Sequence, residues 1–295
     1  MVRDSTMKVL FLLLALAIAS RADLTSEPVD DRLLQAELLR FAEAQLSAGK
    51  TTKADVLKTQ LARRRCEVAL LPVSTKSETL SAAASRTRPG VAVVGGVFKC
   101  KKCTNWHLSA ASGFFISADG ILVTNHHVVA SADKETLVVL SGDGRMAPVT
   151  EVLAADAVAD VAIVRCKGTG FPALPLSADA ADGSPVGVWS HPASHFFSLS
   201  AGIVARRFLL QKTGGPKCEA LAITADYARG SSGGPVFDDR GNVVGMVAST
   251  DSVYYEQENG QQKNLQMVFK NCVSARSILA LIEPKTANTE PKAAR

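Results

Sequence analysis

The chain has 295 residues, 47% hydrophobic and 21% charged, so it can bury a core and is not a disordered, highly charged polypeptide. Its net charge of +5 falls to +3 without residues 1–22, which carry Arg3, Lys8 and Arg21 against Asp4. Such a small excess over a long chain excludes the basic footprint of a nucleic-acid-binding protein.

The N-terminus has the pattern of a secretory signal peptide. Lys8 precedes an apolar run over residues 9–19, and Ser20-Arg21-Ala22 follows it. The apolar run is too short to span a bilayer comfortably, which takes about 20 residues. We therefore expect residues 1–22 to be removed on export to the periplasm or extracellular space, leaving no stable membrane span.

Residues 23–71 have a helical pattern. Apolar side chains recur at helical spacing from Leu33 to Leu46, Gly49 breaks the pattern, and a second series runs from Val56 to Leu71. Two helices around a glycine turn predict an αα-hairpin. Its apolar stripe requires a partner, which is the rest of the chain, the hairpin itself or another subunit. We therefore expect a docking or homo-oligomerisation element, with an inhibitory segment as the sharper hypothesis.

The composition changes again after the helical segment. Residues 72–90 are rich in Ser, Thr and Ala, which is typical of a linker. Over residues 91–283, short β-rich runs alternate with Gly, Asp and Pro, a texture that predicts closed antiparallel barrels. Residues 284–295 are predicted to form a flexible tail.

Two segments of the β-rich region carry a base and an acid. His126 and His127 follow an apolar strand-like run, which would hold a base rigidly. Asp160 comes directly before a β-branched run, and a carboxylate so close to a core strand needs a partner such as a histidine N–H. Asp156 is the alternative acid, although its alanine neighbours open no apolar strand.

Ser232 lies in Gly230-Ser231-Ser232-Gly233-Gly234-Pro235, a sequence suited to a tight turn that exposes a nucleophile. The backbone N–H groups of Gly230 and Ser232 can converge on one point, as stabilisation of an oxyanion requires. The alternative for this motif alone is an ordinary Gly-Ser turn between strands. A histidine and an aspartate elsewhere in the chain favour the catalytic interpretation, because a serine hydroxyl needs a base to become nucleophilic.

In this order, the three segments around His127, Asp160 and Ser232 resemble those of trypsin-like serine peptidases of the HtrA/Deg type, which have the chymotrypsin fold. The resemblance extends from about residue 91 to about residue 282. It implies a mainly β fold of two six-stranded antiparallel barrels, with the active site between them. The sequence departs from the usual HtrA layout because no room remains for a C-terminal PDZ domain.

The resemblance also implies roles for single residues. His127 rather than His126 becomes the base, Asp160 the orienting acid and Ser232 the nucleophile, with the N–H groups of Gly230 and Ser232 as the oxyanion hole. Substrate contacts are expected from four further residues: Asp226, Tyr227, Val247 and Ser249. Asp226 stands six residues before the nucleophile, where trypsin-like enzymes that cleave after Lys or Arg carry their pocket acid, but HtrA-type enzymes shape this loop differently.

The six cysteines allow fifteen pairings, which the sequence does not resolve. Cys100 and Cys103 form a Cys-x-x-Cys motif in a predicted hairpin tip and are a candidate disulfide. Free thiols and a partial zinc site that includes His107 are the alternatives. We expect no metal ion and no organic cofactor.

The sequence therefore predicts an exported serine endopeptidase that acts on extended or unfolded protein or peptide substrates through an acyl-enzyme. Its alternative is a catalytically latent double-barrel binding or scaffold protein. An esterase using the same three residues would differ only in the acyl group.

Overall fold

The computed structural model describes residues 28–284 apart from residues 101, 132, 212–214 and 259–260, and apart from the side chains of residues 257, 258 and 284. The predicted signal peptide over residues 1–22 lies outside the described residues, as does the predicted tail beyond residue 284. Within the described part of the chain, no helix is long and apolar enough to cross a membrane.

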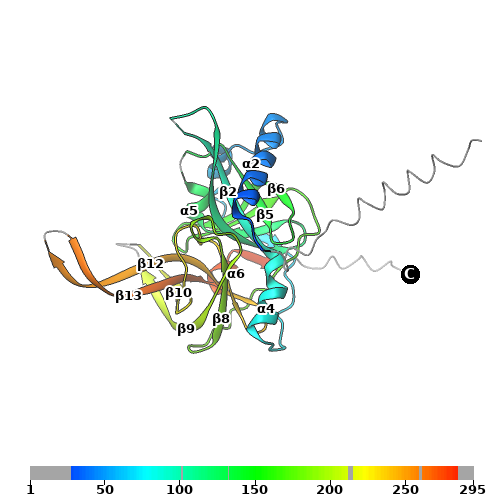
Figure 1. Ribbon diagram of the computed structural model, residues 1–295. Helices are drawn as coiled ribbons and strands as arrows, with labels where there is room; N and C mark the ends of the chain where they lie inside the picture. Colours follow the sequence, from blue (N-terminus) through cyan, green and yellow to red (C-terminus); the bar gives the residue numbers. More distant parts are fainter. Residues whose placement is uncertain (1–27, 101, 132, 212–214, 259–260, 285–295) are drawn as a thin grey trace, which may run out of the picture.

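Two closed six-stranded antiparallel barrels form the body of the protein (Figure 1). The first, in the order β2-β3-β4-β7-β6-β5, consists of β2 (Val91–Lys99), β3 (Trp106–Ser117), β4 (Ile121–Thr124), β5 (Thr136–Ser141), β6 (Met146–Asp156) and β7 (Val161–Cys166). The second, in the order β10-β13-β12-β11-β8-β9, consists of β8 (Pro185–Ser190), β9 (Ser198–Gln211), β10 (Lys217–Ile223), β11 (Pro235–Asp238), β12 (Val243–Glu258) and β13 (Gln261–Ser274). The predicted mainly β, double-barrel fold is confirmed.

Each barrel closes around its own apolar core. Val94, Leu122 and Val164 are at most 1% exposed in the first core, and Val188 and Leu221 are fully buried in the second. β-branched and aromatic side chains suit such pleated, buried surfaces, which is why these runs form strands. The functional loops extend from the strand ends of these two rigid frames.

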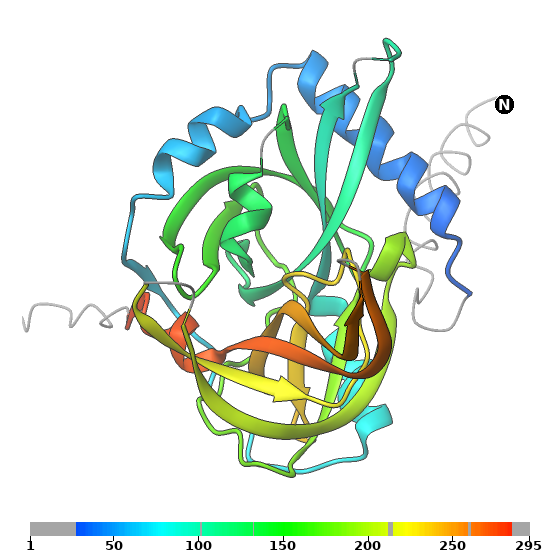
Figure 2. The same ribbon diagram turned by 90° about the vertical axis from the view of Figure 1, so that its left-hand side faces the viewer.

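The N-terminal helices cover the first barrel. α2 (Asp31–Ser47) begins at Asp30, which accepts the N–H of Leu33, and α3 (Ala54–Gln60) follows. Leu38 and Leu57, one from each helix, are fully buried. Figure 2 shows the helices spread along the barrel instead of paired as the predicted αα-hairpin. The chain's own barrel thus buries part of their apolar faces, while Leu33 on α2 and Val56 on α3 stay exposed. Homo-oligomerisation through this segment stays a prediction.

The predicted linker is structured. Within residues 72–90 lie α4 (Leu80–Thr87) and the 3-10 turn η1 (Arg88–Gly90). Trp189 Nε1 lies 3.1 Å from the Ala84 carbonyl oxygen and 3.2 Å from Thr87 Oγ1, which docks α4 on the second barrel. This segment packs through small residues such as Ala83 and Ala84, so its sequence lacks the large apolar stripe that usually signals a packed helix.

The remaining elements are short. They are β1 (Cys66–Val68), α5 (His126–Ala130), the 3-10 turn η2 (Pro192–Ser194), α6 (Ala275–Leu279) and β14 (Ile282–Pro284). β1 and β14 pair in parallel, so the segment before the barrels and the segment after them lie side by side.

Candidate active site

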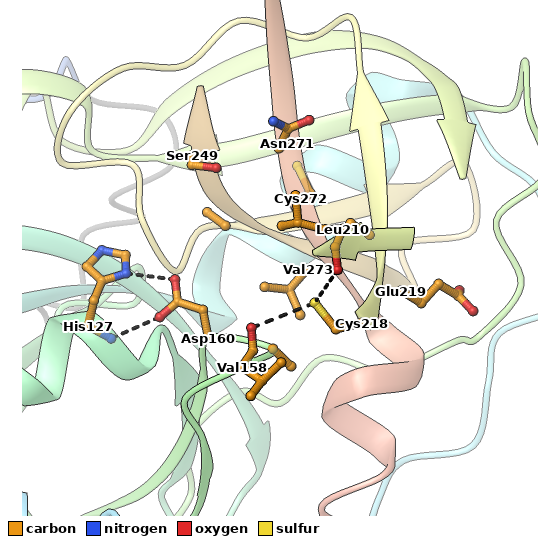
Figure 3. A pocket seen from close by; sticks show the side chains of 13 residues that line it. His127, Val158, Asp160, Leu210, Cys218, Glu219, Ser249, Asn271, Cys272 and Val273 are labelled. Atoms are coloured by element: carbon orange, nitrogen blue, oxygen red, sulfur yellow. Dashed lines mark hydrogen bonds and ion pairs between the residues drawn. The ribbon is translucent and has the colours of Figure 1, made fainter. Parts of the chain in front are cut away.

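His127 and Asp160 form a doubly bonded pair in the first barrel. His127 stands on α5 just after β4, and Asp160 directly precedes β7. The Nδ1 of His127 lies 2.7 Å from Asp160 Oδ2, and the backbone N–H of His127 donates to Oδ1 at 3.0 Å (Figure 3). Both carboxylate oxygens are thus used by one residue. An Nδ1–H that donates to Asp160 leaves Nε2 of a neutral imidazole free to accept a proton.

Asp160 adopts an unusual backbone conformation, with a φ of 60°. Its carbonyl oxygen accepts the side-chain N–H of Asn125 at 3.0 Å and the backbone N–H of His126 at 3.2 Å. Left-handed backbone costs free energy in residues other than glycine, and such strain is concentrated at functional sites. These two hydrogen bonds hold the backbone of Asp160 in place, so that its side-chain carboxylate stays against the imidazole of His127.

Neither alternative residue joins this pair. His126 is half-buried, and burial lowers the pKa of its imidazole. The Oδ1 of Asp156 accepts the backbone N–H groups of Val158 at 2.7 Å and Ala159 at 3.1 Å, so this carboxylate holds a turn. The structure therefore brings His127 together with Asp160, and leaves Asp156 at the end of β6, where it caps the following turn.

Ser232 lies in the loop between β10 and β11 of the second barrel, and this loop is anchored to the first. The backbone N–H of Ser112 on β3 donates to the Ser232 carbonyl oxygen at 2.8 Å. Gly233 has a φ of 91°, and a Cβ there would lie 2.6 Å from Oγ1 of Thr124, at the end of β4. Among the described residues no hydrogen bond joins Ser232 Oγ to His127. In unliganded active sites such bonds often tighten only when substrate binds.

The backbone N–H groups around Ser232 are available to a ligand. Within the described part of the chain, the N–H groups of Gly230 and Ser232 have no hydrogen-bond acceptor. Each of these N–H groups shares a peptide plane with the carbonyl of the preceding residue. The Arg229 carbonyl accepts the backbone N–H of Ala193 at 2.7 Å, and the Ser231 carbonyl accepts the backbone N–H of Gly234 at 2.9 Å. Because a trans peptide points its N–H opposite to its carbonyl, these bonds fix the direction of both free donors.

The loop over residues 191–197 supports this arrangement, a role that the residue types do not indicate. Ala193, Ser194 and Phe197 all have positive φ, between 49° and 65°. Three hydrogen bonds bear on this loop: Phe197 N–H to His191 Nδ1 at 2.9 Å, Phe196 N–H to Asp31 Oδ1 at 2.7 Å, and His191 N–H to Ser112 Oγ at 3.2 Å. Most of these contacts use backbone atoms, which leave no signature in residue types.

Comparison with known proteins agrees with this geometry. Residues 111–246 match the family described as the trypsin-like peptidase domain. This part of the chain is similar to a trypsin-like peptidase domain. It is 38% identical over 145 residues to a probable periplasmic serine endoprotease, DegP-like, of Ectopseudomonas mendocina, covering 47% of this chain and 29% of that protein. It is 37% identical over 145 residues to the mitochondrial serine protease HTRA2 of Bos taurus, covering 47% of this chain and 31% of that protein. The chain thus spans less than a third of the length of these relatives.

Solved structures share the double-barrel fold. The HtrA-type protease AlgW with a decapeptide superimposes with a TM-score of 0.54 at 20% identity, over 69% of this chain and 66% of that one. The active form of the Rv3671c protease from M. tuberculosis gives a TM-score of 0.52 at 24% identity, over 73% of this chain and 91% of that one. At these identities the likeness establishes the double-barrel fold.

A pocket of about 350 Å³ opens beside the His127–Asp160 pair (Figure 3). It lies between the loop before Asp160 and the strands β9, β10, β12 and β13 of the second barrel. Its lining is mostly apolar and consists of His127, Val158, Ala159, Asp160, Leu210, Cys218, Glu219, Ala220, Ala248, Ser249, Asn271, Cys272 and Val273. Ser249, one of the expected substrate contacts, is among them.

The other expected substrate contacts lie differently. Asp226 is 89% exposed and pairs with Lys270 at 3.2 Å, so its carboxylate faces solvent and not the base of a pocket. The hydroxyl of Tyr227 lies 2.8 Å from the carbonyl oxygens of Ser249 and Asn271, inside the second barrel, and burial raises its pKa. Tyr227 therefore supports the pocket wall from within.

Val247 was expected to contact substrate, and this prediction is wrong. Its side chain is 1% exposed in the second core, and its backbone N–H and carbonyl are bonded to Gly234 and Gly233. A residue whose side chain and backbone are both occupied has nothing to offer a substrate.

The candidate disulfide is not formed. Cys100 and Cys103 are free thiols whose Sγ atoms lie 3.2 Å apart, well beyond a disulfide bond of about 2.05 Å.

Proposed function

We propose that this protein is an exported serine endopeptidase that cleaves extended or unfolded protein chains through an acyl-enzyme. The single observation that carries the proposal is the doubly bonded His127–Asp160 pair, set across the barrel junction from a serine loop with two free N–H donors. The serine protease names of the relatives support the same reaction class.

In the proposed mechanism, Ser232 Oγ attacks the scissile carbonyl carbon while His127 Nε2 takes the hydroxyl proton. The resulting imidazolium is stabilised by Asp160, which already accepts the Nδ1–H. His127 then gives the proton to the leaving amine, and the C–N bond breaks to leave the acyl-enzyme. Water then attacks this ester while His127 takes its proton. His127 returns that proton to Ser232 Oγ as the ester C–O bond breaks and the carboxylic acid product leaves.

Negative charge on the carbonyl oxygen would be met by the N–H groups of Gly230 and Ser232. These donors need no reorganisation, because the Arg229 and Ser231 carbonyl groups of their peptide units are already bonded to the backbone N–H groups of Ala193 and Gly234. Such pre-oriented donors each contribute about 10²–10³ in rate.

An extended substrate suits the edge of β12. β11 pairs with β12 only as far as Met246, and Val247 bonds to the serine loop. From Ala248 on, this edge of β12 has no strand partner among the described residues, so a peptide could add there as a further strand. The pocket that Ser249 lines would then take an apolar side chain.

Export rests on the N-terminal sequence pattern and on the periplasmic names of relatives such as the DegP-like endoprotease. Amino-terminal sequencing of the protein secreted from a bacterial host would test it. A mature terminus near residue 23 is expected, and retention of residues 1–22 in the cytosol would contradict export.

A fluorophosphonate probe tests the chemistry, because it reacts with an activated serine. Wild type should be labelled and Ser232→Ala should not. Ser231→Ala is the matched control, since Ser231 is buried and its Oγ accepts the Ala228 N–H. It should retain the label. A well-folded wild type that resists the probe would favour the latent binding protein, for which the missing Ser232–His127 hydrogen bond is the one specific observation.

A further inference from the structure

A second cluster of reactive side chains lies in the β2–β3 hairpin, outside the residues used by the proposed mechanism. Cys100, Cys103 and His107 each offer a ligand atom, and these atoms all lie within 4.8 Å of one another. Cys103 Sγ is 3.0 Å from His107 Nε2 and 3.2 Å from Cys100 Sγ. Among the described residues this is the one group of three or more such ligands.

The strand register explains why the three side chains converge. Phe98 on β2 is paired with His107 on β3, and Lys99 with Trp106. Side chains alternate between the faces of a strand, so Cys100 continues the face of Phe98 and His107. The ring of Phe98 stacks on that of His107, with centroids 5.5 Å apart at 30°, and fixes the direction of the imidazole. The turn then brings Cys103 back between the other two.

We propose that Cys100, Cys103 and His107 bind one thiophilic d10 cation of the zinc class. Two thiolates and an imidazole form a donor set that zinc prefers, and three protein ligands leave a fourth position for water or an external ligand. In a tetrahedral zinc site with Zn–S bonds of about 2.3 Å, sulfur atoms are ~3.8 Å apart. The two Sγ atoms need to separate by about 0.6 Å from their 3.2 Å to admit the ion.

The arrangement of the donor atoms favours ligation. Cys103 Sγ lies 3.2 Å from Cys100 Sγ and 3.0 Å from His107 Nε2, so the three donors already face one another. Metal binding would release the thiol protons, because the thiolate is the ligand. The bound cation would close the hairpin tip, whose residues Trp106 and Leu108 pack with α2 against the outer face of the first barrel.

The test is metal binding by the reduced full-length protein after chelator treatment, with Zn²⁺ and Co²⁺ as probes. We expect one equivalent of Zn²⁺ per chain, a rise in Tm, release of protons, and a thiolate-to-cobalt charge-transfer band with Co²⁺. Cys103→Ser should weaken cobalt affinity at least about 100-fold, more than loss of an outer-sphere partner usually does. His107→Gln provides a second variant with both thiols retained, and it should also weaken binding.

Cys66→Ser is the matched control, because Cys66 is a half-buried free thiol whose pKa is raised to about 11 by burial, and it belongs to β1. It should bind both metals as wild type does. The proposal is overturned if the reduced protein retains no stoichiometric metal, or if Cys103→Ser and His107→Gln bind as tightly as Cys66→Ser. A Cys100–Cys103 disulfide in the isolated protein, with no metal uptake after reduction, would also overturn it. None of these outcomes depends on peptidase activity.

Discussion

Asp31 in the first turn of α2 accepts the backbone N–H of Phe196 at 2.7 Å, and its second oxygen lies 3.3 Å from His195 Nδ1. The N-terminal helix therefore holds a loop of the second barrel. The same loop presents Ala193 N–H to the Arg229 carbonyl, which adjoins the proposed oxyanion donor Gly230. A continuous path of contacts thus links the helical segment to the active site.

Asp31→Ala should lower kcat about tenfold, less than the 10²–10³ lost with an oxyanion donor itself, because the loop is only loosened. Asp30→Ala is the matched control. It removes the α2 cap, at about 1 kcal/mol of stability, without touching the loop. Peptide hydrolysis and urea unfolding of both variants would separate the effects. Equal kcat in the two variants would contradict a positioning role for Asp31 and leave the helix as a simple cover.

Asp160→Asn should reduce kcat by roughly 10⁴, because the amide cannot accept hydrogen bonds from both His127 N–H groups and favours the wrong imidazole tautomer. Asp156→Asn should keep its kcat, since Asp156 only caps a turn. Steady-state kinetics on one peptide substrate distinguishes them. A comparable loss of kcat in both variants would show that Asp160 has been incorrectly assigned as the acid that orients His127.

Gly230→Ala should lower kcat at least about 100-fold, because the backbone N–H of residue 230 would move away from the oxyanion that it is proposed to bind. Gly230 has a φ of 96°, and a Cβ there would lie 2.5 Å from the His191 carbonyl oxygen. Gly183→Ala shares the strain of a positive φ, 85°, but has open space around the new Cβ. Both variants should lose about 1–2 kcal/mol from the left-handed backbone. Activity is expected to survive only in Gly183→Ala, and survival in both would remove Gly230 from the oxyanion site.

His191 should make the fold acid-sensitive. Burial lowers its pKa to about 4, against about 6.5 for an unfolded histidine. Between these values the unfolded chain binds a proton that the folded chain does not, so the free energy of unfolding falls as pH is lowered. The difference over this window is roughly 3 kcal/mol. Urea unfolding at pH 7 and pH 5 should show a smaller drop for His191→Gln, whose side-chain oxygen can still accept the Phe197 N–H. An identical drop would place the acid sensitivity elsewhere.

Substrate preference should not depend on Asp226. Because this carboxylate is exposed and paired with Lys270, Asp226→Ala should leave the ratio of kcat/KM for Arg and Val at the residue before the cleaved bond unchanged within about twofold. A matched pair of fluorogenic peptides measures the ratio. A selective loss of Arg cleavage in the variant would restore Asp226 as a pocket acid.

The barrels and the pairing of His127 with Asp160 could be predicted because their signals are local. Alternating apolar runs specify strands, and a histidine, an acid and a glycine-rich serine turn each stand in a short recognisable segment. The 72–90 segment could not be predicted, because Ala83 and Ala84 bury a helix face without large apolar residues. Val247 was misassigned for a related reason, since only the fold shows which strand edge is already bonded.

The hydrogen bonds that support the site could not be predicted from the sequence. Ser112, Ala193 and Asp31 act through backbone partners far away in the chain, such as the 165-residue separation between Asp31 and Phe196. Nothing in the residue types around them indicates such a partner. The same holds for the free state of the Gly230 and Ser232 N–H groups, which depends on where neighbouring carbonyl groups point.

Hydrolysis of a fluorescently labelled unfolded protein tests the central claim most directly, with wild type beside Ser232→Ala at equal concentration and with matching thermal unfolding curves. The account predicts steady turnover by wild type and none above the uncatalysed background for Ser232→Ala. Turnover that persists in Ser232→Ala would contradict the assigned nucleophile, and a folded wild type without turnover would contradict the proposed peptidase activity.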